Sequence, residues 1–219
     1  MKAFLFDLNG TMIDDMDYHT DAWHNIINNQ LGGNMSREAV KMEMYGKNQE
    51  VLVRVFGEGR FKAEEMDQIS FEKEKKYQQT YKPHLRLISG LDSFLERAYQ
   101  KGIKMAIGSA AITFNIDFVL DGLDVRKYFP VAISADHVTK SKPDPETFIS
   151  AAQGLGVQAE DCLVFEDNPK GVEAARRAGM KSVVITTMHQ EHEFEGLDNI
   201  LCFIKDYHDP YLQELLEQI

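Results

Sequence analysis

The fold is decided by the stretch Lys2-Ala3-Phe4-Leu5-Phe6-Asp7-Leu8-Asn9-Gly10-Thr11. Its apolar first half predicts a buried parallel strand, and its second half predicts a loop that begins with an acidic side chain. In open α/β sheets, ligands bind in the loops outside the carboxyl ends of the strands. We therefore expect Asp7 to lie at a binding site.

From residue 87 onward, short apolar runs alternate with segments of helical periodicity. This alternation predicts a Rossmann-like α/β core, in which helices cover both faces of a parallel sheet. The further strands are expected at residues 103–107, 130–133, 162–165, 181–186 and 200–204, and the helices at residues 90–100, 112–120, 145–154 and 169–178, with a short helix at the C-terminus.

Residues 14–83 have a different composition. They are polar and helix-favouring, and glycines interrupt them at several points. Apolar residues recur at helical spacing, and residues 62–81 predict one longer, charged helix. Within it, residues 72–76 alternate in charge, which is typical of an exposed helix face. We expect residues 14–83 to form a helical cap domain inserted into a core domain of residues 1–13 and 84–219.

Composition limits the partners of this 219-residue chain. Its formal net charge of −11 argues against a nucleic-acid surface, which needs a basic stripe, but allows a small phosphorylated substrate. No apolar run approaches the roughly 18 residues of a membrane span, and no signal peptide is recognisable. Cys162 and Cys202 lie in apolar segments and are expected to be reduced core residues. We expect a cytoplasmic protein without membrane contact, and nothing in the sequence demands more than a monomer.

Four short motifs stand next to expected strands or helices, and taken singly each is more often structural than catalytic. For example, an acidic pair ahead of Pro169 is also typical of a helix N-terminus. Together and in this order they predict a site at one edge of the sheet, where the carboxyl ends of parallel strands meet. No Gly-x-Gly-x-x-Gly follows the first strand, which argues against a nicotinamide dehydrogenase. The motifs are Asp7-Leu8-Asn9-Gly10-Thr11, Gly108-Ser109-Ala110, Lys142-Pro143-Asp144-Pro145-Glu146 and Glu166-Asp167-Asn168.

In order and placement these motifs resemble those of the haloacid dehalogenase-like superfamily of phosphohydrolases, and the resemblance covers essentially the whole chain. It implies that Asp7 is a nucleophile that forms an aspartyl-phosphate and so divides hydrolysis into two easier steps. It also implies that Ser109 donates a hydrogen bond to a phosphoryl oxygen. Lys142 would place a positive charge against the phosphate and the nucleophile.

The same resemblance implies a Mg²⁺ ion, because an anionic nucleophile and an anionic phosphate repel each other. Mg²⁺ prefers oxygen ligands in an octahedral arrangement. The implied ligands are Asp7, the backbone carbonyl of Asn9, Asp167 and, directly or through water, Glu166.

The inserted domain resembles the cap of the family's first subclass, and Asp17-Tyr18-His19 resembles the β-phosphoglucomutase branch. This implies substrate contacts from the cap and the core, although a cap-helix histidine such as His19 could instead face solvent. The phosphate-gripping arginine of that branch falls at Gln49, and uncharged residues replace its polar contacts at residues 111–113. These departures argue against a mutase, which must hold two phosphates. The implied substrate-binding residues are His19, Trp23, Lys47, Ser109, Ala110 and Lys142.

Asn9 stands where the family motif has a second aspartate. That aspartate protonates the leaving group and activates water, which contributes about 10²–10⁴-fold, and an amide cannot replace it. Four interpretations are open: a slow phosphatase, a phospho-ligand-binding protein, a deliberate substitution that traps substrate, or partial deamidation of Asn9 to aspartate. We favour a Mg²⁺-dependent phosphatase of a small phosphorylated metabolite. The alternatives are a catalytically weak phospho-ligand-binding pseudoenzyme and a β-phosphoglucomutase.

Overall fold

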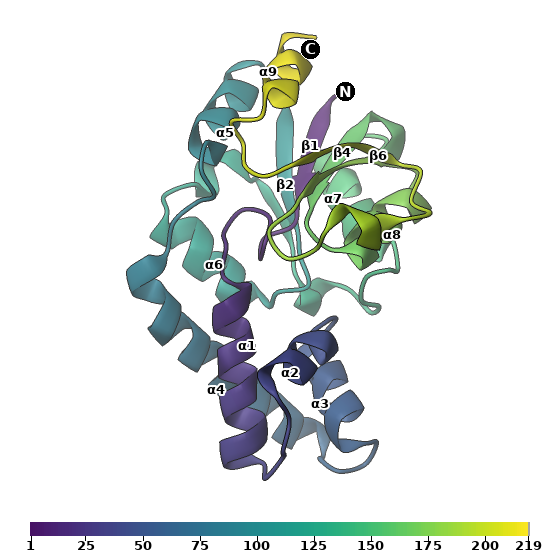
Figure 1. Ribbon diagram of the computed structural model, residues 1–219. Helices are drawn as coiled ribbons and strands as arrows, with labels where there is room; N and C mark the ends of the chain where they lie inside the picture. Colours follow the sequence, from purple (N-terminus) through teal and green to yellow (C-terminus); the bar gives the residue numbers. More distant parts are fainter. Residues whose placement is uncertain (219) are drawn as a thin grey trace. The chain divides into compact units, whose positions relative to one another are not determined.

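The computed structural model in Figure 1 describes residues 1–218, which fold as two compact units. The first unit, the core domain, comprises Met1–Asp14 and the chain from Arg86 onward. The second, the cap domain, comprises Asp15–Leu85. Within residues 1–218, no helix combines the length and apolar character needed to cross a membrane.

The core domain contains a six-stranded sheet in the order β3-β2-β1-β4-β5-β6, and every neighbouring pair is parallel. This confirms the predicted α/β class. The first strand is central, because it pairs with β2 on one side and with β4 on the other. The strand order therefore reverses beside β1, which is where open α/β sheets bind ligands. The strands are β1 (Ala3–Phe6), β2 (Lys104–Gly108), β3 (Val131–Ile133), β4 (Cys162–Glu166), β5 (Lys181–Ile185) and β6 (Ile200–Ile204).

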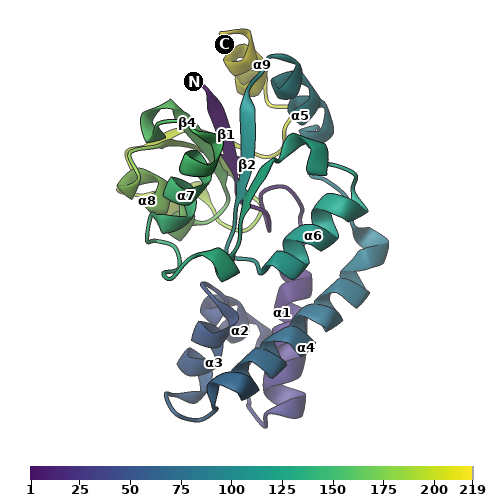
Figure 2. The same cartoon turned by 180° about the vertical axis from the view of Figure 1, so that it is seen from behind.

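Helices cover both faces of this sheet, as Figure 2 shows from behind. The α-helices of the core domain are α5 (Leu91–Gln100), α6 (Thr113–Gly122), α7 (Glu146–Leu155), α8 (Pro169–Arg177) and α9 (Pro210–Glu217). Short 3₁₀-helices are η3 (Arg126–Tyr128), η4 (Ala135–His137), η5 (Ala159–Asp161) and η6 (Glu191–Phe194).

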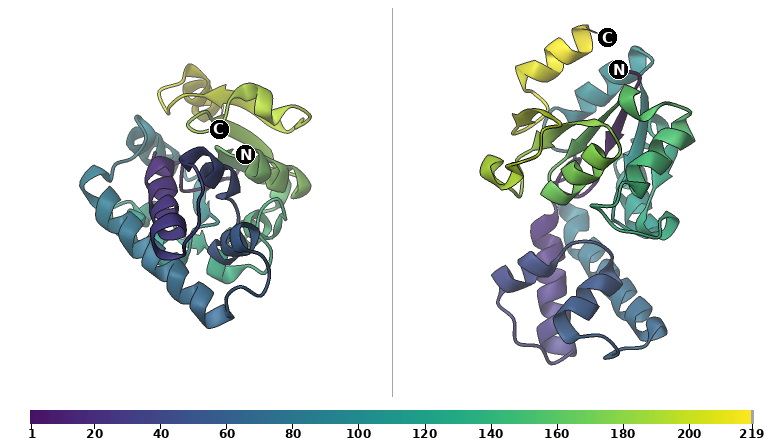
Figure 3. Two further views of the ribbon diagram at one scale, coloured as in Figure 1. Left: turned by 60° about the horizontal axis from the view of Figure 1, so that its bottom comes forward. Right: turned by 90° about the vertical axis from the view of Figure 1, so that its right-hand side faces the viewer.

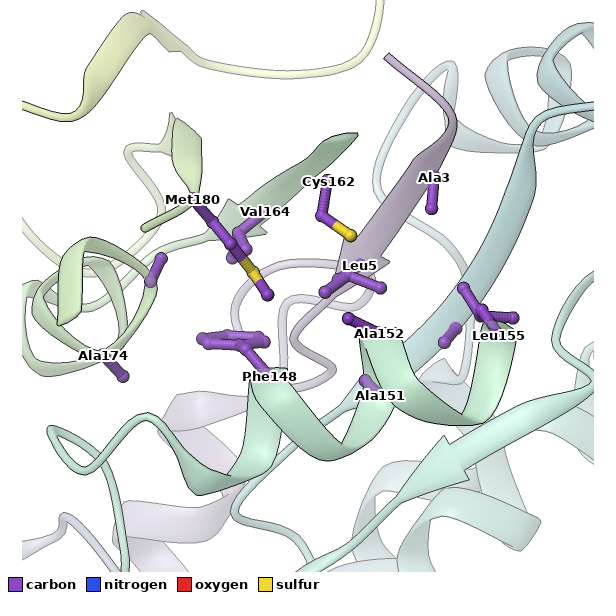
Figure 4. Close-up of a cluster of buried hydrophobic side chains, with 12 residues drawn as sticks. Ala3, Leu5, Phe148, Ala151, Ala152, Leu155, Cys162, Val164, Ala174 and Met180 are labelled. Atoms are coloured by element: carbon purple, nitrogen blue, oxygen red, sulfur yellow. The ribbon is translucent and has the colours of Figure 1, made fainter. Parts of the chain in front are cut away.

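The side chains of β1 alternate between the two faces of the sheet, as a strand requires. On one face, Leu5 lies with Phe148 of α7 and Met180 in a buried cluster that Figure 4 shows. On the other face, the Phe6 ring stacks on Phe165, with 4.6 Å between ring centroids, and Phe94 of α5 meets the same ring edge-on. Both faces of the central strand are thus apolar, which fixes its register and the place where Asp7 leaves it.

The cap domain has its own hydrophobic core, and Figure 3 shows its helices from two sides. Two of its buried residues, Trp23 and Ile27, belong to the apolar residues of segment 14–83 that recur at helical spacing in the sequence. The α-helix ends at Asn25 and continues as a π-helical turn. Its elements are α1 (Met16–Asn25), the π-helix η1 (Ile26–Gln30), α2 (Arg37–Glu43), α3 (Asn48–Phe56), α4 (Ala63–Tyr81) and the 3₁₀-helix η2 (Lys82–His84).

Candidate active site

The turn after β1 carries the first motif. The Asp7 amide donates to the carbonyl of Phe165 in β4 (3.0 Å), so the end of β1 remains attached to the sheet. The chain then turns at Gly10, whose φ of +77° favours glycine, and the Gly10 amide donates to the carbonyl of Ile13 (2.8 Å). Asp7 therefore lies at the middle of the sheet's carboxyl edge, where the sequence predicts a site.

Lys142 joins the first, third and fourth motifs. Its Nζ lies 2.7 Å from Oδ1 of Asp7 and 2.7 Å from Oε1 of Glu166. Burial lowers the pKa of Lys142, but the two carboxylates raise it by more, so the pKa lies above its ordinary value and the ammonium stays charged. The positive charge also lies 4.6 Å from the ring centroid of Phe148. One buried cation thus holds the nucleophile candidate and a second carboxylate together.

Both carboxylate oxygens of Glu166 have protein partners. One accepts the bond from Lys142, and the other accepts bonds from the amides of Asp167 (2.9 Å) and Asn168 (2.8 Å). A Cβ on Gly171 would lie 1.7 Å from Oε1 of Glu166, so only glycine leaves room for this arrangement. In this structure Glu166 thus orients Lys142 and the loop after β4. Its role as a metal ligand, directly or through water, stays a prediction.

Asp167 faces the turn of the first motif. Thr11 donates its hydroxyl to Oδ1 of Asp167 (3.2 Å), and the Asp167 carboxylate packs against Gly10. Burial raises the pKa of Asp167 well above its ordinary value, and the charges of Glu166 and Asp7 raise it further. Burial likewise raises the pKa of Asp7, to about 6, although Lys142 opposes this. Three carboxylates around one ammonium leave an excess of negative charge that a cation would relieve.

The donor set of this site fits Mg²⁺. Among residues 1–218, no group of three or more His, Cys, Asp or Glu side chains is arranged to hold a metal ion. Mg²⁺, however, is usually bound by only one or two carboxylates, together with waters and substrate phosphate. Asp7 and Asp167 are two such carboxylates, and Asn9 offers a backbone carbonyl in the turn between them. All three are oxygen donors, and metal binding would favour the ionised form of both carboxyl groups.

The second motif lies on the neighbouring strand. Ser109 follows β2 and is 1% exposed, and its side chain makes a hydrogen bond to Asp7 that lowers the pKa of the carboxyl group. Ser109 Oγ also accepts from the amide of Ala111 (3.2 Å), which fixes the loop around the half-buried Ala110. Thr113 directs its hydroxyl to Asp136 (2.7 Å). The structure thus brings all four motifs of the core domain together.

Two contacts on the first motif have no counterpart among the sequence predictions. Thr187 donates its hydroxyl to the carbonyl of Gly10 (2.6 Å), and Tyr207 donates its hydroxyl to the carbonyl of Thr11 (3.0 Å). Neither residue belongs to a motif or a periodic pattern, so only the three-dimensional arrangement of the chain reveals them.

The cap domain contains a second polar cluster, centred on His19. This histidine is 7% exposed and does not face solvent. Its Nδ1 lies 2.6 Å from Nζ of Lys73, and its ring stacks on Tyr77 with 3.7 Å between centroids. Lys73 Nζ also donates to Glu74 (3.0 Å). The prediction that residues 72–76 form an exposed helix face is therefore wrong for Lys73 and Glu74, which are 2% and 3% exposed.

The other cap residues named from the sequence have different environments. Trp23 is 1% exposed and packs in the hydrophobic core of the cap, so in this conformation it is a core residue and has no surface for a substrate. Lys47 is half-buried at the start of α3, where its amide donates to Glu50 (3.0 Å). Gln49 donates to Asp67 (2.8 Å).

A parallel α/β core with a helical cap inserted after its first strand defines the haloacid dehalogenase-like class of hydrolases. The family model described as haloacid dehalogenase-like hydrolase matches residues 4–185, and the chain belongs to this family.

Several relatives are known. The fructose-1-phosphate phosphatase YqaB of Escherichia coli (strain K12) is 28% identical over 185 residues, which cover 83% of this chain and 94% of that protein. The β-phosphoglucomutase of Bacillus subtilis (strain 168) is 28% identical over 188 residues, which cover 84% and 82% of the two chains. A solved structure of CbbY from Rhodobacter sphaeroides shares the fold, with a TM-score of 0.83 at 23% identity over 95% of this chain and 96% of that chain. That structure holds a mutant in which an aspartate is replaced by asparagine, in complex with xylulose 1,5-bisphosphate.

Proposed function

We propose that this protein is a Mg²⁺-dependent phosphatase that hydrolyses a small phosphorylated metabolite through Asp7. The observation that carries the proposal is the position of Lys142, 2.7 Å from both Asp7 and Glu166 at the switch point of the sheet. A buried ammonium beside a carboxylate at this place suits a site that must neutralise a phosphoryl group. The phosphatase activity named for the E. coli relative supports the same reaction type.

The first chemical step needs an ionised Asp7. Its pKa of about 6 leaves the carboxylate ionised at pH 7.5, so Oδ can attack the phosphorus while the bond to the leaving alcohol oxygen breaks. Lys142 and Ser109 would hold the phosphoryl oxygens during this attack. A bound Mg²⁺ ion, held by Asp7, Asp167 and the carbonyl of Asn9, would supply charge neutralisation. Water then hydrolyses the aspartyl-phosphate and releases inorganic phosphate.

Asn9 limits the two proton transfers that these reaction steps require. The leaving alkoxide must gain a proton and the attacking water must lose one, and an amide does neither at neutral pH. Solvent would have to serve instead, which favours substrates with good leaving groups. A slow phosphatase is therefore expected, and residues 1–218 retain the rest of the proposed machinery.

The proposed substrate is a sugar phosphate or a similar polyol phosphate. The names of the relatives, which include fructose 1-phosphate and phosphorylated carbohydrates, support this class. The proposed contacts of the core domain with this substrate are Ser109, Ala110 and Lys142. Neutral residues at Gln49 and Ile112 argue against a second phosphate, so we expect no isomerisation that depends on glucose 1,6-bisphosphate.

A second candidate function is binding of a phosphorylated ligand with little turnover. Asn9 favours it, because an amide cannot carry out the proton transfers that turnover requires. In its solved structure, the CbbY mutant with an asparagine in place of an aspartate holds xylulose 1,5-bisphosphate. The two functions differ in turnover and share the same ligand class.

The test is Mg²⁺-dependent hydrolysis of p-nitrophenyl phosphate by the protein and by its Asn9→Asp variant. Restoring the carboxyl group should raise kcat/KM by about 10² or more. The Asp7→Asn variant is the control and should be inactive in both backgrounds. Equal activity with Asn and Asp at position 9 would show that another group transfers the proton. Absence of turnover even in Asn9→Asp, despite measurable Mg²⁺ binding, would favour the binding protein.

A further inference from the structure

We propose that Thr187 and His189 are positioning residues of the active site, which hold the first and fourth motifs in register from the loop after β5. The inference rests on the proposed function, because it assumes that Asn9 and Asp167 bind the metal. It concerns residues that belong to none of the four motifs.

Thr187 makes a hydrogen bond to the backbone of the first motif. Its hydroxyl donates a 2.6 Å hydrogen bond to the carbonyl of Gly10. Gly10 directly follows Asn9, whose own carbonyl is a proposed metal ligand, so the two carbonyls belong to consecutive peptide units. Only the φ and ψ angles of Gly10 separate the two units. The Gly10 amide, which belongs to the first unit, donates to the carbonyl of Ile13 (2.8 Å), so this bond and the bond from Thr187 together restrict the direction of the Asn9 carbonyl.

His189 makes a hydrogen bond to Asn168 of the fourth motif. Asn168 is the N-cap of α8, and its Oδ1 accepts a hydrogen bond from the amide of Lys170 (2.9 Å). The side-chain NH₂ group of Asn168 therefore points to His189 and lies 3.2 Å from its Nε2. Because an NH₂ group only donates, Nε2 must accept. The ring proton then lies on Nδ1, which donates to Oε1 of Glu193 (2.9 Å). This network fixes the tautomer of His189 and the rotamer of Asn168 together.

The two contacts serve one purpose. Thr187 holds the residue that follows Asn9, and His189 holds the residue that follows Asp167. One short loop between β5 and η6 therefore touches both segments from which the proposed metal ligands come, although these segments are more than 150 residues apart in the sequence. Groups that orient metal ligands in this way usually contribute about 10–100-fold to metal affinity or activity.

The chain offers a matched control for each residue. Thr186 stands next to Thr187 and directs its hydroxyl away from the site, to the carbonyl of Ile204 (3.3 Å). His192 stands on η6, three residues after His189, and is exposed. Substitutions at Thr186 and His192 remove the same chemical groups without touching either motif.

The experiment compares Thr187→Val with Thr186→Val, and His189→Phe with His192→Phe, by calorimetric titration with Mg²⁺ alone. We expect Thr187→Val and His189→Phe each to weaken Mg²⁺ binding by about 10–100-fold, whereas the two controls stay within about twofold of the parent protein. Thr187→Ser, which keeps the hydroxyl, should restore binding. A purely structural role would not separate Ser from Val in this way while the melting temperatures remain similar.

Two further readouts complete the test. Hydrogen–deuterium exchange of residues 8–13 without Mg²⁺ should be faster in Thr187→Val than in Thr186→Val, because Thr187→Val removes the hydrogen bond to the carbonyl of Gly10. With p-nitrophenyl phosphate, kcat should fall at saturating Mg²⁺ while KM changes little. Equal Mg²⁺ affinity in Thr187→Val and Thr186→Val would overturn the inference and leave the proposed function intact. If the parent protein itself neither binds Mg²⁺ nor hydrolyses the ester, the proposed function fails, and this inference fails with it.

Discussion

A Cβ atom on Gly10 would lie 2.1 Å from Oδ2 of Asp167, a distance that no side chain tolerates. The backbone of the first motif therefore passes directly against the carboxylate of the fourth. The two segments leave neighbouring strands, β1 and β4, and converge because both turn at the same edge of the sheet. The glycine of the first motif is thus a requirement of packing as well as of backbone conformation.

Gly10→Ala should abolish Mg²⁺ binding and phosphatase activity. The substitution strains a backbone with φ +77° and also displaces Asp167. Gly102→Ala separates the two effects, because Gly102 has the same φ of +77° and its Cβ would meet nothing within 4 Å. Both variants should lose about 1–2 kcal/mol of stability from the left-handed conformation, and only Gly10→Ala should lose the metal. Calorimetric Mg²⁺ titration and urea unfolding measure the two quantities; loss of binding in both variants would assign the effect to backbone strain.

Lys142→Met should destabilise the metal-free protein by about 3–5 kcal/mol, because it leaves Asp7 and Glu166 buried beside each other without their shared cation. Lys140→Met is the control, since that side chain is 74% exposed and its ion pair with Asp144 is long (3.7 Å). Urea unfolding without Mg²⁺ compares the two. A loss of similar size in both variants would contradict the structural role of the buried pair.

The pH dependence of the Lys142→Met effect has a definite sign. Without the ammonium, burial and Glu166 both act to raise the pKa of Asp7, which is already about 6 in the parent protein. A carboxyl group whose folded pKa lies above the unfolded value of about 3.9 binds its proton more tightly when folded. Its contribution to stability is therefore complete at low pH and is lost as the pH rises through the folded pKa. The variant should be less destabilised at pH 5 than at pH 8, and the opposite order would refute this account.

Much of the core site could be predicted from the sequence. Short apolar runs define the strands, and a parallel sheet brings the residues after them to one edge, so Asp7, Ser109 and Asp167 meet as expected. The partners of Glu166 could not be predicted in the same way. Whether a carboxylate faces a metal or a lysine depends on distances of a few ångströms, which spacing along the chain does not encode.

The cap illustrates a different limit. Alternating charges on α4 have the same pattern whether the helix face is exposed or buried, and only the position of α1 against α4 decides that Lys73 and Glu74 are buried with His19. Trp23 has the opposite ambiguity, since an aromatic residue on a cap helix can contact either substrate or core. Tertiary packing resolves both cases.

The two cysteines should be inert in the folded protein. Burial raises the pKa of Cys162 to about 11 and that of Cys202 to about 12. At pH 8, a thiol with a pKa of about 11 is only about 0.1% thiolate, and the thiolate is the reactive form. Ellman's reagent at pH 8 should therefore label neither thiol within minutes in the native state and both in guanidinium chloride. Rapid modification of one native thiol would show that its environment is more open than the structure indicates.

Lys73 and Glu74 should be strongly coupled in a double-mutant cycle. Lys73→Met removes the ammonium that lies 3.0 Å from Glu74, and Glu74→Gln removes the charge that compensates the buried lysine, whose pKa burial lowers. Each single substitution should cost about 3–5 kcal/mol. The double variant should cost less than the sum, by about 0.5–3 kcal/mol, because it removes both members of the Lys73–Glu74 pair and leaves neither without the other. Lys75→Met, at an exposed position of the same helix, is the control and should change stability by less than about 0.5 kcal/mol. Urea unfolding measures the free energy of unfolding of the four cycle members and of the control. Strictly additive losses of stability would mean that solvent reaches both charges and that His19 does not lie in a closed ionic cluster.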